Sequence, residues 1–170
     1  MRKKKKLSIH KFISVLVLSL APPCEGGLDV GIVLDKSKSV KRKNLIRVIA
    51  TLVKLVDKFN PAPDKDHFGL VTFNNKAETE FTFTDKTLYS KDQLKKRIGG
   101  MSTSLDWQTR TDLAMEKARD DLFSPLGGDR SDKPNVMILL TDGKPKPQPQ
   151  PFDQFAAEFY NDSKVFNRKL

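Results

Sequence analysis

Three short apolar runs constrain the fold of this chain more than any other feature. Each has the length of one strand, and together they occupy residues 28–34, 67–73 and 135–140. Continuous aliphatic and β-branched runs of this length are typical of strands that are buried on both faces. Between and after them, apolar residues recur at helical spacing, which predicts helices at residues 44–59, 91–98, 111–123 and 152–167.

The order of these elements predicts the fold class. Strands that alternate with helices favour a doubly wound α/β fold, in which a mostly parallel sheet lies between layers of helices. Residues 78–84 alternate polar and apolar side chains, which is typical of a half-exposed edge strand. In a sheet of this kind, ligands bind at the carboxyl ends of the strands.

The N-terminal segment resembles a secretory leader. Six basic residues precede an apolar stretch at residues 12–21, which is shorter than the roughly 20 residues needed to span a bilayer. We therefore expect a signal peptide at residues 1–26, a single domain at residues 27–170, secretion to the extracellular space, and no stable membrane insertion after cleavage. Without the leader, the formal charge falls from +10 to about +5, and no aromatic-interleaved basic motif remains, which argues against nucleic-acid binding.

The remaining chemistry-bearing residues exclude several classes of site. The single cysteine, Cys24, is removed with the leader, forms an intermolecular disulfide, or pairs with a residue outside this chain. One cysteine and two histidines cannot build a zinc centre, and no phosphate-binding glycine motif is present, so we expect no enzymatic activity. Asn161 begins an N-glycosylation sequon, although such triplets also arise by chance.

Polar side chains follow two of the apolar runs. Asp35, Ser37 and Ser39 come after the first run, and Asp142 comes after the last. Each alone is also explained as a helix cap. Together, at one edge of a sheet, they form an all-oxygen ligand set that favours Mg2+, Mn2+ or Ca2+ over softer metals.

The segments DKSKS, TRTDLAMEKA and MILLTDGKP resemble the von Willebrand factor A domain and its metal-ion-dependent adhesion site (MIDAS). The resemblance extends over residues 28–170 and implies a set of metal ligands, namely Asp35, Ser37, Ser39, Thr109 and Asp142. It also implies that Thr111 supports the site through a hydrogen bond, and that the ion is Mg2+ or Mn2+. Lys38 stands where the family often has glycine. The last strands of the family fold are missing, so we expect an incomplete domain.

Two functions are consistent with this resemblance. The first is an extracellular adhesion module whose metal ion coordinates an acidic side chain of a matrix or cell-surface protein, such as a collagen. The alternative is a structural extracellular-matrix domain with a vestigial metal site. Trp107, beside the threonine motif, is interpreted either as a ligand contact or as a packing residue.

Overall fold

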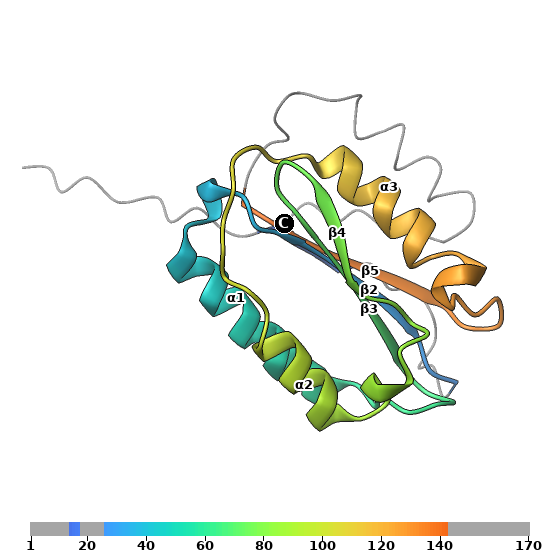
Figure 1. Cartoon of the computed structure of the whole chain (residues 1–170). Coiled ribbons are helices and arrows are strands. Elements are labelled where there is room, and N and C mark those ends of the chain that lie inside the picture. Colours follow the sequence, from blue (N-terminus) through green and yellow to red (C-terminus); the bar gives the residue numbers. More distant parts are fainter. Residues whose placement is uncertain (1–13, 18–25, 143–170) are drawn as a thin grey trace, which may run out of the picture.

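The computed structural model describes residues 26–142 of the chain, together with the backbone of residues 14–17. A five-stranded sheet lies between two layers of helices, and Figure 1 views this sheet nearly edge-on. The strands, in spatial order, are β1 (Ser14–Val17), β5 (Asn135–Thr141), β2 (Asp29–Asp35), β3 (His67–Phe73) and β4 (Ala77–Phe81). The helices are α1 (Arg42–Leu55) and α2 (Lys91–Gly99) on one face and α3 (Thr111–Asp121) on the other.

The sheet confirms the predicted doubly wound α/β class. Strand β2 lies at the centre and pairs in parallel with both β3 and β5. Strand β4 pairs antiparallel with β3 and corresponds to the predicted edge strand. It ends at Phe81, earlier than expected, because the chain turns there: the Asp85 N–H donates to the Thr82 carbonyl.

The N-terminal segment contributes one short strand to the sheet. Strand β1 pairs antiparallel with β5, from Ser14 opposite Thr141 to Val17 opposite Ile138. Most of the predicted signal peptide, Cys24, Asn161 and the predicted helix at 152–167 lie outside the described residues. Cleavage of the leader and the missing last strands therefore stay predictions. Within the residues that the structure describes, no helix has the length and apolar character needed to cross a membrane.

The core has two parts, one on each face of the sheet, because successive strand residues point to opposite sides. On β2, Ile32 and Leu34 pack against the buried faces of α1 and α2. Val33 points the other way and packs with the buried side chains of α3. Strands β3 and β5 repeat this alternation, so burial on both faces explains the continuous apolar runs in the sequence.

Two glycines let α3 approach the sheet closely. Gly31 and Gly69 are opposite each other in the β2–β3 register. A Cβ atom on Gly31 would lie 2.5 Å from Cζ of Phe123, and one on Gly69 would lie 2.7 Å from Cδ2 of Leu122. Any larger residue at either position would push the end of α3 away from the sheet.

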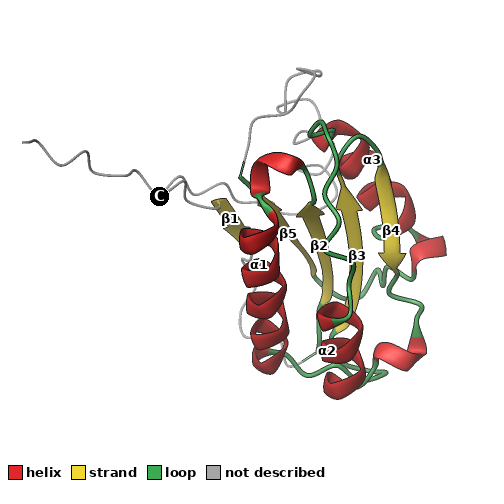
Figure 2. Ribbon diagram, turned by 60° about the vertical axis from the view of Figure 1, so that its left-hand side comes forward, coloured by secondary structure: helices red, strands yellow, loops and turns green. Residues whose placement is uncertain are grey.

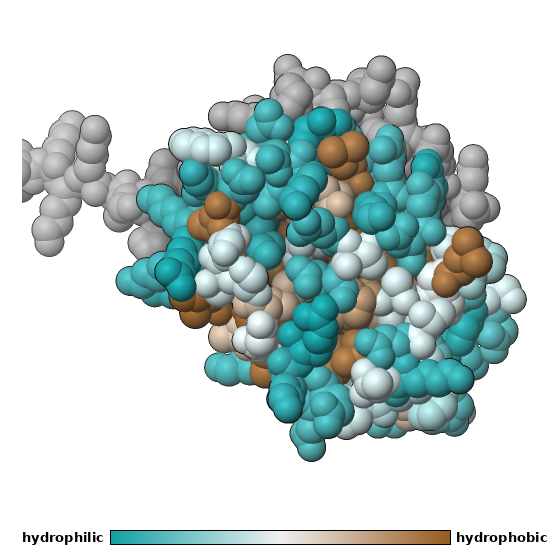
Figure 3. All heavy atoms as spheres, in the orientation of Figure 1, coloured by the Kyte–Doolittle hydropathy of each residue, from teal (hydrophilic) through white to brown (hydrophobic). Residues whose placement is uncertain are grey.

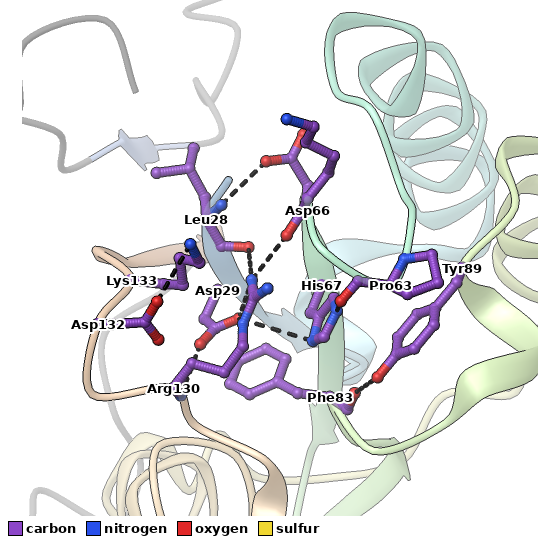
Figure 4. Close-up of polar contacts among 11 residues, drawn as sticks. Leu28, Asp29, Pro63, Asp66, His67, Phe83, Tyr89, Arg130, Asp132 and Lys133 are labelled. Carbon is purple, nitrogen blue, oxygen red and sulfur yellow. Dashed lines mark hydrogen bonds and ion pairs between the residues drawn. The ribbon is translucent and has the colours of Figure 1, made fainter. Parts of the chain in front are cut away.

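A buried ion pair holds the amino ends of the central strands together (Figure 4). Asp29 is completely buried, and Arg130 donates to its Oδ1 from Nε at 2.9 Å and from Nη2 at 2.7 Å. The Arg130 backbone N–H donates to Oδ2 at 2.8 Å. Nη2 also donates to the carbonyls of Leu28 and Lys65. One side chain thus ties β2 and the segment before β3 to the connection between α3 and β5.

His67 lies against this ion pair and is held neutral. Its Nε2 donates to the Pro63 carbonyl at 3.0 Å, and its ring stacks on Tyr89 with centroids 4.2 Å apart. Its Nδ1 has no hydrogen-bond partner and lies 4.0 Å from Oδ1 of Asp29. Burial lowers the pKa of His67, and the nearby Arg130 charge lowers it further.

We expect Asp29→Ala to lower the free energy of unfolding by about 3 kcal/mol or more, because it leaves Arg130 unpaired in a largely buried position. Urea denaturation followed by circular dichroism measures the change. Asp132→Ala is the matched control, because its carboxylate pairs with Lys133 on the surface and is 73% exposed. Equal effects of the two substitutions would show that the Asp29 pair is not a structural lock.

We also expect stability to depend on pH through His67. Its folded-state pKa lies below its ordinary value of 6.5, so the unfolded chain binds the proton more readily than the folded one. The contribution of His67 is therefore complete above pH 6.5 and is lost as the pH falls through the folded-state pKa. When the pH is lowered from about 7.5 to about 5, the denaturation midpoint of the unsubstituted protein should fall. The midpoint of His67→Gln should fall by a smaller amount. Identical profiles would contradict this origin.

Candidate functional site

The parallel register brings the ends of β2 and β5 to the same edge of the sheet. Strands β2 and β5 are neighbours in the sheet (Figure 2). Leu34 pairs with Leu140, so Asp35 and Thr141 follow side by side at the carboxyl ends of their strands, and Asp142 comes next. The two aspartates that the sequence places after buried strands therefore lie at one edge.

Four of the predicted site residues form one hydrogen-bonded network. The hydroxyls of Ser37 and Ser39 lie 2.9 Å apart, and the Ser39 hydroxyl donates to Oδ1 of Asp142 at 2.9 Å. The backbone N–H of Ser37 donates to Oδ1 of Asp35 at 2.7 Å. Oδ2 of Asp35 accepts a hydrogen bond of 2.6 Å from the Thr141 hydroxyl. The DKSKS segment is thus joined to Asp142, which lies more than a hundred residues away in the chain.

The two serines do not act as helix caps. Ser37 precedes a short 3-10 helix (Lys38–Val40), and its side chain makes no capping hydrogen bond there. The N-cap position of α1 is Lys41, which also makes no side-chain capping bond. The simpler explanation from the sequence is therefore wrong for these hydroxyls, which bond instead to each other and to Asp142.

The negative charge of this network is not balanced by a basic side chain. Asp35 is only 1% exposed, and burial raises the pKa of its carboxyl. The Asp142 charge raises this pKa too, while the hydrogen bonds from Thr141 and Ser37 partly lower it. Among residues 26–142, no lysine, arginine or histidine forms an ion pair with either aspartate. A buried carboxylate beside a second one is stabilised by a cation.

Backbone pairing fixes the loop between α2 and α3 (residues 100–110, the threonine loop) to the loop between β2 and α1 (residues 36–41, the serine loop). The Lys38 N–H donates to the Asp106 carbonyl at 2.8 Å, and the Asp106 N–H donates to the Lys36 carbonyl at 3.2 Å. Thr109 and Thr111 follow Asp106 in the chain and are 4% and 5% exposed. Neither side chain hydrogen-bonds to the network within the described residues, and the Thr111 hydroxyl is buried without any hydrogen-bond partner.

Asp112, in the first turn of α3, is already engaged. Arg110 donates to both of its carboxylate oxygens, with the shortest contact at 2.6 Å from Nη2 to Oδ2. This interaction lowers the pKa of Asp112. Asp112 is therefore neutralised locally, in contrast to Asp35 and Asp142.

Thr141 has a role that sequence reasoning did not assign, and Trp107 makes a contact that it did not predict. Thr141 positions the buried Asp35 carboxylate, and its only signal in the sequence is a hydroxyl at the end of an apolar strand. Trp107 is 68% exposed, which excludes a role in the core, and Nζ of Lys38 lies 3.9 Å from its ring centroid. The head of Lys38 is thus held over an aromatic ring.

These residues fit a hard divalent cation better than a soft one. Within the described part of the chain, no three histidine, cysteine, aspartate or glutamate residues converge on a metal position, so a site here depends on hydroxyl oxygens. The oxygens available come from two serines, two aspartates and the buried threonines. An unbalanced carboxylate and an unpartnered buried hydroxyl both suit a cation such as Mg2+ with its bound waters.

Comparison with known proteins identifies relatives of this chain. The family model of the von Willebrand factor type A domain matches residues 29–158. The chain is 29% identical to matrilin-3 of Homo sapiens over 71% of its length, 30% identical to vitrin of Mus musculus over 81%, and 30% identical to integrin alpha-2 of Bos taurus over 71%. It spans only 25%, 22% and 10% of these proteins, respectively.

Solved structures agree with this result. The chain resembles proximal thread matrix protein 1 from the mussel byssus with a TM-score of 0.73 and 26% identity, over 82% of this chain and 36% of that one. A second structure of the same protein, which has a zinc-occupied MIDAS motif, matches with a TM-score of 0.72 and 27% identity over 88% of this chain and 36% of that one.

The geometry predicts that Ser39→Ala does not weaken α1. Loss of a capping hydroxyl typically costs about 1 kcal/mol, whereas we expect a smaller change in EDTA, because Ser39 caps no helix and its hydrogen bond to Asp142 is exposed to solvent. Ser124→Ala is the control, since the Ser124 hydroxyl accepts from the Gly127 N–H at 3.2 Å in a true cap. Chemical denaturation compares the two. A larger loss for Ser39→Ala than for Ser124→Ala would restore the capping interpretation.

Proposed function

The chain belongs to the von Willebrand factor type A domain family, and we propose that it is an extracellular, metal-dependent adhesion module. Its relatives are matrix and adhesion proteins, and the family is not enzymatic. The observation that carries the proposal is the serine–aspartate network, in which a buried carboxylate and a second aspartate have no basic partner among residues 26–142.

In this proposal, Ser37, Ser39 and Thr109 bind a Mg2+ or Mn2+ ion through their hydroxyls, and Ca2+ has the same ligand preference. Asp35 and Asp142 neutralise part of its charge. Thr111, whose buried hydroxyl lacks a partner, hydrogen-bonds to the ligands or to the waters of the ion. The bound ion supplies an exchangeable coordination position. Because neutral hydroxyls leave the ion strongly electrophilic, that position favours the carboxylate of a partner protein.

The partner we propose is an extracellular-matrix or cell-surface protein that presents an acidic residue. The kinship with matrilin and vitrin supports this, as do the predicted signal peptide at residues 1–26 and the sequon at Asn161. Figure 3 shows one face of the molecule, which is mostly hydrophilic with small, separate apolar areas. That surface suits recognition through charge and metal coordination better than through a broad apolar interface.

One observation favours the alternative of a structural matrix domain with a vestigial site. The Ser37 and Ser39 hydroxyls bond to each other, and the Ser39 hydroxyl also donates to Asp142. The Asp35 carboxylate accepts from the Ser37 N–H and the Thr141 hydroxyl. These polar atoms therefore have hydrogen-bond partners without an ion, although their negative charge is unbalanced among residues 26–142, and a measurement of metal binding separates the two functions.

We expect calorimetry with Mg2+ and with Mn2+ to show a single site on the folded chain. Asp35→Ala and Ser39→Ala should abolish the binding heat, because each removes an oxygen from the network, and Ser124→Ala should leave it unchanged. Circular dichroism establishes that each variant is folded. A folded, unsubstituted chain that binds neither ion would favour the structural alternative.

The same variants test whether the ion captures a partner. Adhesion to a surface coated with extracellular-matrix extract should disappear in EDTA and return with Mg2+. Attraction between surface charges alone would instead survive EDTA and decline smoothly with added salt. Adhesion of that second kind would contradict the metal-dependent mechanism.

A further inference from the structure

Trp107 is the single tryptophan of the chain and is exposed beside the candidate metal site. Its position is set by backbone contacts rather than by packing. The preceding residue, Asp106, forms backbone hydrogen bonds with the residues on both sides of Ser37. These bonds join the threonine loop, which carries Trp107, to the serine loop. The Trp107 N–H donates to Oδ1 of Asp106 at 2.7 Å, and this bond fixes the backbone nitrogen of Trp107. The indole ring is therefore presented at the rim of the serine–aspartate network.

The backbone on either side of this rim is strained. Within the described residues, only two non-glycine residues have a positive φ, namely Lys41 at 63° and Gln108 at 67°. Lys41 lies at the end of the serine loop, and Gln108 follows Trp107 directly. Such conformations are uncommon for residues with a Cβ atom, and they concentrate at binding sites, where the surrounding structure maintains them. Both strained positions flank the same site.

The rim also carries several basic side chains. Four exposed residues form this basic rim: Lys38, Lys41, Arg42 and Lys43. None of them forms an ion pair within the described part of the chain, and the first turn of α1 contains no acidic residue. Positive charges at a helix N-terminus are unfavourable, because they add to the positive end of the helix dipole. A binding partner with negative charge relieves this repulsion.

The geometry points to Trp107 and Lys38 as a recognition platform. The partner's carboxylate binds the metal ion, and the platform contacts the partner residues that flank this carboxylate in sequence. We assign to this platform an acidic polypeptide segment that carries a proline or aromatic ring within about three residues of that carboxylate. The exposed indole contacts the ring, and Lys38 and the basic rim attract further acidic residues of the segment. This inference rests on the proposed function, because the metal-bound carboxylate anchors the segment.

An array of blocked peptides with one fixed glutamate tests this platform. Each of the three positions on either side of the glutamate is varied through all residues, and the full chain is applied in Mg2+ and in EDTA. We expect Mg2+-dependent binding that requires the glutamate and is stronger with proline or an aromatic residue at a flanking position. Trp107→Ala should reduce that ring preference about fivefold and keep the glutamate requirement. Trp107→Phe should retain most of the preference.

Two further variants complete the test. Leu126→Ala is the matched control, because Leu126 is 93% exposed but follows the opposite end of α3, and its peptide profile should be unchanged. Lys38→Glu should reverse the preference for additional acidic residues. The best soluble peptide should also shift the emission of the single tryptophan to shorter wavelength and protect it from acrylamide quenching. Unchanged emission at saturation, or an unchanged ring preference in Trp107→Ala, would overturn the platform.

The outcomes separate the two proposals. Ring-dependent binding that needs Trp107 but survives EDTA would overturn the metal mechanism and retain the platform. Mg2+- and glutamate-dependent binding with the same flanking preference in Trp107→Ala would retain the metal mechanism and overturn the platform. An array without bound peptide in either buffer would overturn both.

Discussion

The position of β2 between two parallel neighbours is the constraint on which the rest of the molecule depends. Its register with β3 and β5 places Asp35, Phe73 and Thr141 at one edge. Both faces of β2 are buried, so a shift of one residue would exchange the side chains of the two core layers. The core therefore fixes the register, and the register brings Asp35 beside Thr141 and Asp142.

The two ends of β2 carry buried aspartates in opposite electrostatic situations. Asp29, at the amino end, accepts three hydrogen bonds from Arg130 and is neutralised inside the fold. Asp35, at the carboxyl end, is equally buried, but within residues 26–142 it accepts only from the neutral donors Thr141 and Ser37. The first arrangement locks the strand connections together. The second leaves a negative charge that an external cation is suited to balance, as the proposed metal site requires.

Local patterns predict the fold class, and the structure brings four of the candidate site residues together. Strands β2, β3 and β5 and the three α-helices followed from apolar spacing, and Asp35 and Asp142 followed from their place after buried strands. The pairing of β1 with β5 was not predicted. The Asp29–Arg130 pair was not predicted, because the two residues are separated by about a hundred positions and no motif links them. The end of β4 was misplaced for a different reason: Thr82 to Thr84 continue the alternation of a strand, although a backbone turn has already begun.

A lysine between the two serines is unexpected in a site proposed to bind a cation, and the structure offers a physical explanation. The Lys38 backbone N–H is fixed by the Asp106 carbonyl, which brings Trp107 within reach of the lysine head. Nζ then lies over the indole ring, whose face attracts cations. The positive charge is held on the tryptophan rather than left free to approach the serine hydroxyls. The departure from the family pattern is thus compatible with metal binding, and it places a fixed positive charge where an acidic partner would arrive.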